Sequence, residues 1–267
     1  MTAYSMPTLQ ELGPDLLKVN RFGAFLALSF PFVLTFGFFI FALEGWWLAA
    51  LLCPVVLSFY TYASISHDLV HRNLGLPRWL NEVLLCAIEL LTLRAGHAYR
   101  ASHLHHHAHF PSHDDLEGAA AAMPWWRALL DGPTLQVRIW LHAVKSSRRD
   151  RAWIWGEGAA VLLILAGSLA ALPWTCLPAF FCGLNLAGSW VYPIATSWIP
   201  HDAHGATELT QTRLFRGRVI GFLALEHLYH LEHHLYPQVP HFQWPELARR
   251  LDPYLERAGI KAHRLWF

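Results

Sequence analysis

The sequence predicts an all-α integral membrane protein, with four transmembrane helices in two hairpins and a cytoplasmic, histidine-rich helical cap. The chain of 267 residues is 54% hydrophobic and only 15% charged, whereas an average soluble domain carries about 25% charged residues. Its apolar residues are concentrated in four long runs, which pair into two predicted hairpins. Its Lys and Arg residues lie mostly outside the short links that join the two runs of each hairpin. Because no polar linker divides the chain, we expect residues 1–267 to form a single domain.

Four apolar runs are long enough to cross a bilayer. They cover about 22–43, 46–66, 153–172 and 174–199. Crossing a hydrocarbon core of about 30 Å takes about 20 helical residues, at about 1.5 Å per residue. The alternative is a set of buried helices in a large soluble core, but such cores rarely contain four apolar runs of this length. The first run is too long for a cleavable signal peptide, and no small-residue cleavage site follows it.

Basic residues distinguish the two sides of the membrane. The links inside the hairpins, at 43–45 and 172–173, are short and carry no Lys or Arg. Basic residues precede the first run, precede the third and follow the fourth, as Lys18, Arg149 and Arg216 illustrate. Under the positive-inside rule, this asymmetry places both termini and the long central segment in the cytoplasm.

The apolar segment 79–95 is predicted to lie at the membrane interface. It contains four residues that are costly at the bilayer centre: Asn81, Glu82, Glu89 and Arg94. A crossing there would also place His67 and His103 on opposite sides of the membrane. We therefore expect an interfacial or re-entrant helix, which leaves residues 96–152 and 200–267 as the cytoplasmic cap.

Histidine clusters carry the strongest chemical signal. The chain has 18 histidines, and eight of them lie at H-x3-H or H-x2-HH spacing within the segments HDLVH, HLHHH and HLEHH: His67, His71, His103, His106, His107, His230, His233 and His234. Positions i, i+3 and i+4 share one face of a helix, so each cluster presents two or three imidazoles together. Imidazole binds Fe, Zn, Cu and Ni, and eight imidazoles exceed the coordination of one ion. The pattern predicts a two-metal centre; the alternative is a histidine-rich surface that binds metal adventitiously.

The three segments resemble the membrane fatty acid desaturase superfamily. HDLVH, YRASHLHHH and LYHLEHHLYPQVP carry this resemblance, which covers roughly residues 55–247. The superfamily includes acyl desaturases, bacterial alkane monooxygenases and the carotenoid ketolases and hydroxylases. The resemblance implies two non-haem irons, held by the eight clustered histidines at the cytosolic end of a four-helix membrane bundle, with O2 as co-substrate.

The resemblance also implies one further ligand after the fourth crossing. SWIPHDAHG offers His201 and His204, and His201 is favoured because it lies nearer the membrane end of the helix. The alternative is that both histidines only line the cytoplasmic rim.

Other residues near the clusters are expected to support the ligands. Carboxylates can fix imidazole tautomers through the ring N–H that faces away from the metal. Candidates are Asp68, Asp115, Glu117, Asp202 and Glu232, with His204 and His227 as further neighbours. Arg94 and Arg100 are candidates for contact with an anionic substrate head group. We expect His105 and His109 to be bystanders and assign no role to His97, His113, His142, His241 and His263.

The implied function is an oxidoreductase that uses O2 and external electrons to activate C–H bonds of a lipid, with fatty-acyl desaturation as the favoured reaction. The alternative reaction is that of a carotenoid ketolase or hydroxylase acting on the β-ionone ring. The sequence does not distinguish an acyl substrate from a carotenoid, because generic apolar side chains would line the substrate channel for either. A metal-binding membrane protein without catalysis is the alternative from another class.

The electrons are expected to come from a separate protein. The chain has no GxGxxG dinucleotide motif, no CxxCH haem site and no ferredoxin cysteine run. A ferredoxin or a cytochrome b5 is the expected donor, and the basic cytoplasmic face suits an acidic partner. The net charge of +1 argues against nucleic acid as a partner.

Overall fold

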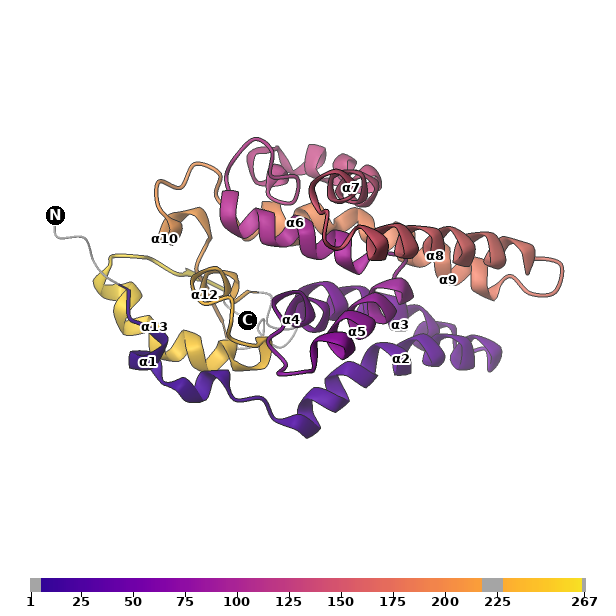
Figure 1. Cartoon of the computed structure of the whole chain (residues 1–267), viewed down its shortest axis with the longest axis horizontal. Coiled ribbons are helices and arrows are strands. Elements are labelled where there is room, and N and C mark those ends of the chain that lie inside the picture. Colours follow the sequence, from indigo (N-terminus) through magenta and orange to yellow (C-terminus); the bar gives the residue numbers. More distant parts are fainter. Residues whose placement is uncertain (1–5, 218–227, 266–267) are drawn as a thin grey trace.

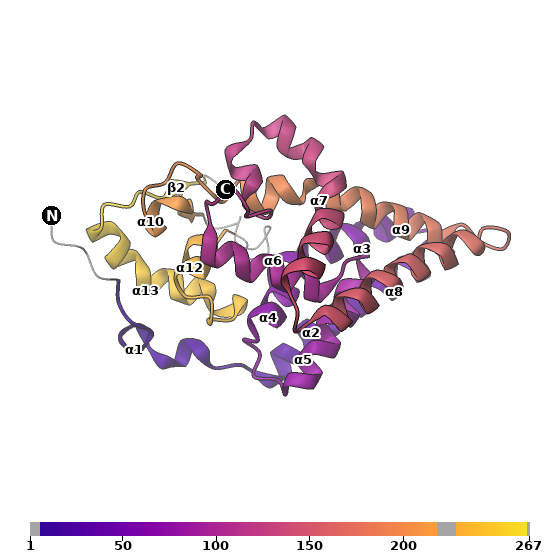
Figure 2. The same cartoon turned by 45° about the horizontal axis from the view of Figure 1, so that its top comes forward.

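The computed structural model describes residues 6–217 and 228–265, and these are mostly helical (Figure 1). One end of the molecule holds four helices: α2 (Arg21–Leu43), α3 (Trp47–Tyr60), α8 (Arg151–Ala170) and α9 (Leu177–Gly188). The opposite end holds shorter elements: α1 (Leu9–Leu12), α10 (Glu208–Gln211), α12 (His230–Leu235) and α13 (Trp244–Arg257). Between them lie α4 (Ser66–His71), α5 (Arg78–Leu91), α6 (Gly96–His109) and α7 (Trp125–Ser146) (Figure 2).

Strand structure in the described part of the chain is minimal, so the predicted all-α class is confirmed. β1 (Phe215–Arg216) pairs in parallel with β2 (His263–Arg264). This short pairing places the C-terminal segment beside the segment that follows α10.

The first hairpin consists of α2 and α3. The side chain of Asn20 caps α2 by accepting hydrogen bonds from the N–H groups of Phe22 and Gly23. Gly45, with a φ of 77°, makes the tight link that glycine favours. Helical backbone then continues from α3 through a π-helical segment, η2 (Thr61–Ile65), directly into α4. The returning helix of the hairpin therefore leads without a loop to His67 and His71.

The second hairpin repeats this arrangement. From α9 the backbone passes through η4 (Ser189–Val191) and a second π-helical segment, η5 (Pro193–Trp198), to His201. The two hairpins meet where Phe38 of α2 packs on Phe181 of α9, with ring centroids 5.0 Å apart. Both returning helices thus deliver histidines to the same region, and π-helical turns are frequent at such functional sites.

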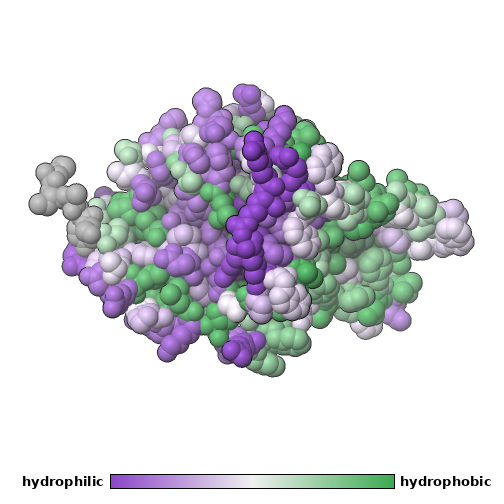
Figure 3. Space-filling model, in the orientation of Figure 1, coloured by the Kyte–Doolittle hydropathy of each residue, from purple (hydrophilic) through white to green (hydrophobic). Residues whose placement is uncertain are grey.

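Within residues 6–217 and 228–265, two helices, α2 and α8, are long and apolar enough to cross a membrane, whereas α3 is a shorter apolar helix. Only 22% of the apolar window of α2 and 17% of that of α8 is buried. On the face drawn in Figure 3, the end of the molecule that carries these helices is mostly hydrophobic. The predicted runs 46–66 and 174–199 contain shorter α-helices than expected, because each ends in a π-helical segment.

The opposite end has its own apolar core. Leu12 and Leu16, near the N-terminus, pack against Leu247 and Leu251 of the amphipathic helix α13. Burying each leucine stabilises the fold by about 2 kcal/mol. Arg250 of α13 also pairs with Asp15 at 2.7 Å, so the N-terminal segment is held against the cap.

Candidate metal centre

Nine imidazoles converge where α4, α6 and α12 approach one another and η5 ends. They form two groups, in each of which the nitrogen atoms lie within 4.8 Å of one another. The five-histidine group consists of His67, His71, His103, His107 and His233. The four-histidine group consists of His106, His201, His230 and His234. The structure therefore brings together all nine predicted ligands, although their role as ligands remains a prediction.

The helices distribute their histidines unevenly. α6 presents His103 and His107, four residues apart, to the five-histidine group and His106 to the other group. α12 presents His233 to the five-histidine group, and the i, i+4 pair His230 and His234 to the four-histidine group. Each HxxHH segment therefore serves both groups, whereas the sequence had suggested that each cluster points at a single spot.

The four-histidine group is compact. The Nε2 atom of His201 lies 3.0 Å from that of His106 and 3.2 Å from those of His230 and His234. The Nδ1 atom of His106 faces Asp115 Oδ2 at 2.7 Å, and that of His201 faces the carbonyl oxygen of Ser197 at 3.2 Å. Both Nδ1 atoms therefore carry the proton, which leaves a lone pair on each Nε2. Two lone pairs at 3.0 Å repel unless a cation lies beside them.

The five-histidine group shows the same pattern. The Nδ1 atom of His103 faces Glu117 Oε1 at 2.8 Å, so its Nε2 lone pair points at His107 Nε2, 3.1 Å away. His107 Nε2 is 2.7 Å from His233 Nε2. Two nitrogens at about 2.0–2.1 Å from one ion lie about 2.9–3.4 Å apart for angles of about 90–109°. The observed spacings are close to this range, and the buried His71 Nε2 has no hydrogen-bond partner among the described residues. The residues thus fit one metal ion per group.

Burial keeps most of these imidazoles neutral, which is the form that binds metal. Burial, aided by the charge of Arg100, lowers the pKa of His71 to about 4. Burial and the neighbouring imidazoles lower the pKa of His107 to about 2, and hold that of His233 well below its usual value. His106 differs: burial lowers its pKa, but the hydrogen bond and charge of Asp115 more than offset this effect and raise it.

The predicted supporting carboxylates divide into two kinds. Asp115 contacts His106, as expected, and Glu117 contacts His103 in the same way. Burial raises the pKa of Glu117 to about 7. Asp68 instead accepts hydrogen bonds from the backbone and ring nitrogens of His241, at 3.0 and 2.7 Å. His241 was assigned no role, but this contact ties the segment after α12 to α4.

Three further candidates make other contacts. Glu232 is fully buried, and its Oε1 pairs with Arg216 at 2.5 Å instead of supporting an imidazole. Asp202 accepts a hydrogen bond from the backbone N–H of His204 at 3.0 Å, and His204 itself is exposed and outside both groups. His227 lies outside the described residues.

Arg94 and Arg100, the candidates for contact with a substrate head group, make contacts within the protein. Both arginines are buried, and each pairs with an acidic residue of α5. Arg94 binds Glu89 through two hydrogen bonds of 2.7 and 2.8 Å, and Arg100 pairs with Glu82. α5 therefore turns Glu82 and Glu89 inward, whereas the sequence had indicated only that these residues are costly at the bilayer centre.

His97 is the residue that sequence reasoning missed most clearly. It is 0% exposed, with Nδ1 2.6 Å from Glu157 Oε1 and Nε2 2.8 Å from Glu82 Oε2. Its ring stacks on Trp153 at 4.7 Å. Through these contacts, His97 joins α6 to α5 and α8. The sequence does contain an indication of this contact, because Glu157 lies within the third apolar run. A carboxylate in such a run needs a polar partner.

Comparison with known proteins agrees with this geometry. The model of the fatty acid desaturase family, described as "Fatty acid desaturase", matches residues 44–266. No curated protein sequence matches the chain. The family match covers most of the chain and all nine clustered histidines. This chain therefore belongs to the fatty acid desaturase family.

Proposed function

We propose that this protein is an integral membrane, non-haem di-iron oxidoreductase that uses O2 and external electrons to introduce a double bond into a fatty-acyl chain. The observation that carries the proposal is the gathering of nine imidazoles into groups of five and four. Family membership supports it, because desaturase-family proteins are membrane-bound oxidoreductases that act on lipids.

Each histidine group would hold one iron. When bound, the pair of irons supplies the reduction of O2 to an oxidant that removes hydrogen from an unactivated C–H bond. Asp115 and Glu117 hold the Nδ1–H groups of His106 and His103, which directs the Nε2 lone pairs toward the metal positions.

Aromatic side chains exclude water from the imidazoles. The ring of Trp244 lies 5.4 Å from that of His67 and 5.2 Å from that of His233. Phe110 covers the four-histidine group, with its ring 5.3 Å from His106 and 4.6 Å from His201. A dry surrounding favours neutral, metal-binding imidazole and protects a reactive oxidant from side reactions.

The proposed membrane placement has four crossings, with the metal centre and both termini in the cytoplasm. The exposed apolar surface of the hairpin end supports this placement, as does its contrast with the opposite end, where hydrophilic residues are more frequent (Figure 3). α3 and α9 would run from the bilayer directly into the segments that carry His67 and His201. A ferredoxin or cytochrome b5 would then approach the basic cytoplasmic surface to deliver electrons.

The test is expression in a host that makes both β-carotene and ordinary phospholipids, followed by metal analysis and by profiling of fatty acids and pigments. We expect about two irons per chain and an O2-dependent new double bond in acyl chains, lost in His107→Ala and retained in His263→Ala. A pigment shift instead would assign the reaction to a carotenoid ring. Bound iron without any O2-dependent product would indicate a non-catalytic metal protein, and zinc without iron would overturn the centre.

A further inference from the structure

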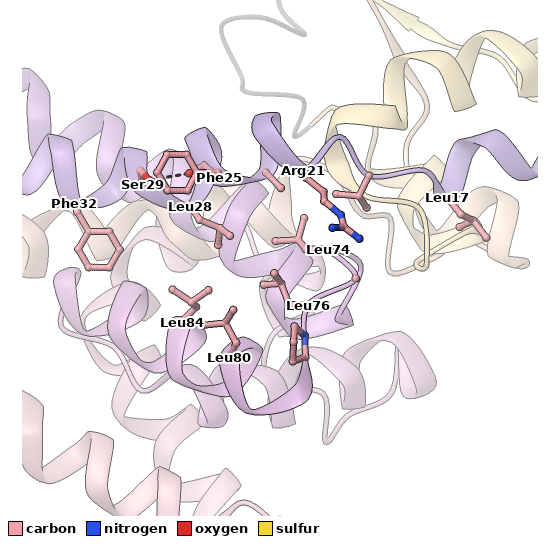
Figure 4. Close-up of a pocket in the computed structure, with 14 residues that line it drawn as sticks. Leu17, Arg21, Phe25, Leu28, Ser29, Phe32, Leu74, Leu76, Leu80 and Leu84 are labelled. Carbon is pink, nitrogen blue, oxygen red and sulfur yellow. Dashed lines mark hydrogen bonds between the residues drawn. The ribbon is translucent and has the colours of Figure 1, made fainter.

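An apolar groove runs along the start of α2, separate from the histidine groups. It has a volume of about 850 Å³ and lies between α2, the loop 74–77 and α5 (Figure 4). Its walls include Leu28 and Phe32 of α2, Leu76 of the loop, and Leu80 and Leu84 of α5. Sites for small molecules typically measure about 300–1,000 Å³, so the groove is large enough for a lipid chain.

The groove is positively charged at one end only. Arg21, the first residue of α2, lies toward that end, with Leu17 beyond it, whereas Phe32 lies at the other end and Leu28, Leu80 and Leu84 lie between Phe32 and Arg21 (Figure 4). None of the described residues that line the groove is acidic. Lys18 lies three residues before Arg21, and the N-terminus of a long helix adds partial positive charge. One end therefore attracts an anion, and the rest favours hydrocarbon.

We propose that this groove binds an anionic membrane phospholipid, with its phosphate at Arg21 and one acyl chain along Leu28, Phe32 and Leu84. α2 runs from Arg21 toward the apolar end of the molecule, so the groove has the polarity of a phospholipid in a bilayer. The inference rests on the proposed placement of α2 across the membrane, but not on the di-iron chemistry. The bound lipid would touch the loop that follows His71, and so would brace the end of the ligand-bearing helix α4.

The direct test is native mass spectrometry of delipidated protein titrated with phosphatidylglycerol or phosphatidylcholine. We expect the anionic lipid to bind more tightly, and Arg21→Gln to weaken its binding about fivefold, as about 1 kcal/mol per surface cation implies. Arg21→Lys should keep the preference. The matched control is Arg151→Gln, because Arg151 is the first residue of α8 and does not line the groove. Equal binding of the two lipids, or equal losses in Arg21→Gln and Arg151→Gln, would overturn the proposal.

A second variant tests the position of the acyl chain. Leu84→Trp should fill the groove and reduce binding of both lipids, whereas Leu163→Trp, on the exposed face of α8, should not. Unchanged binding in Leu84→Trp would place the lipid elsewhere and overturn the assignment. Iron content and turnover are measured on the same samples. Loss of lipid selectivity with normal iron content refutes only this inference, and absence of iron with normal lipid binding refutes only the proposed function.

Discussion

The five-histidine and four-histidine groups differ in how they are built. The five-histidine group draws all of its members from α4, α6 and α12. The four-histidine group depends on His201, a single residue that follows the π-helical segment η5. Loss of one imidazole leaves four in the first group and three in the second. The comparison indicates that the five-histidine group tolerates loss of one imidazole better than the four-histidine group does. The following predictions test this difference.

The largest effect is expected for His201→Ala. We expect iron content to fall from about two to about one per chain, because three imidazoles would hold the second ion poorly, and turnover to be lost. His201→Asn should keep part of both, since an amide oxygen or a bridging water can replace one weak ligand. His71→Ala should retain more iron than His201→Ala, because four imidazoles remain in its group. Metal analysis and turnover assays measure both quantities. More iron in His201→Ala than in His71→Ala would contradict the expected difference between the two groups.

The next effect concerns the carboxylates that orient the imidazoles. Asp115→Ala removes the acceptor for His106 Nδ1–H, and should weaken metal binding by about 10- to 100-fold. The loss should fall on the four-histidine group, whereas Glu117→Ala should affect the group that contains His103. Chelator competition measures the two affinities. Asp202→Ala, whose native side chain binds a backbone N–H, serves as the control and should leave both unchanged.

A change that acts on α6 as a whole should weaken both groups alike. Glu157→Gln removes one of the two carboxylates that hold His97, in a fully buried contact. Removing one partner of a buried pair costs about 3–5 kcal/mol of stability. We expect a lower melting temperature and similar losses of metal from the two groups. The exposed acid Glu44 supplies the control, Glu44→Gln, and selective loss from one group would argue against a shared support through α6.

The smallest effect is the pH dependence of the metal-free protein. Burial lowers the pKa of His71 and of His107 in the folded protein. Between about pH 6.5 and about pH 4, both side chains are therefore protonated in the unfolded chain but mostly neutral in the folded protein. Stability should therefore fall as pH decreases through this window. His106, whose pKa is raised, contributes in the opposite direction, with stability that is present at low pH and lost as pH rises through its folded pKa.

Thermal unfolding of metal-free variants separates these contributions. His107→Gln should flatten the decrease between about pH 7 and about pH 5, and His106→Gln should make it steeper. A melting temperature that does not change with pH in the unsubstituted protein would mean that these imidazoles are not held neutral by burial.

Much of the centre could be predicted from local spacing. The HDLVH, HLHHH and HLEHH segments identified eight of the histidines that gather, whereas the ninth, His201, was expected from the resemblance to the desaturase superfamily. The roles of Asp68, Glu232, Arg94 and Arg100 were predicted less well. Each of these charged residues is buried, and its partner comes from another part of the chain or from an inward-facing helix surface.

The sequence by itself determined the helical class, the apolar hairpins and the histidines that converge, because helix formation and the i, i+3, i+4 spacing are local properties of the chain. Only the tertiary structure decided how those histidines divide into five and four, and which groups the buried charges contact. Glu157 lies 60 residues from His97, and Asp68 lies 173 residues from His241. Which helix faces meet is decided by packing of the whole chain, and local spacing carries no information about it.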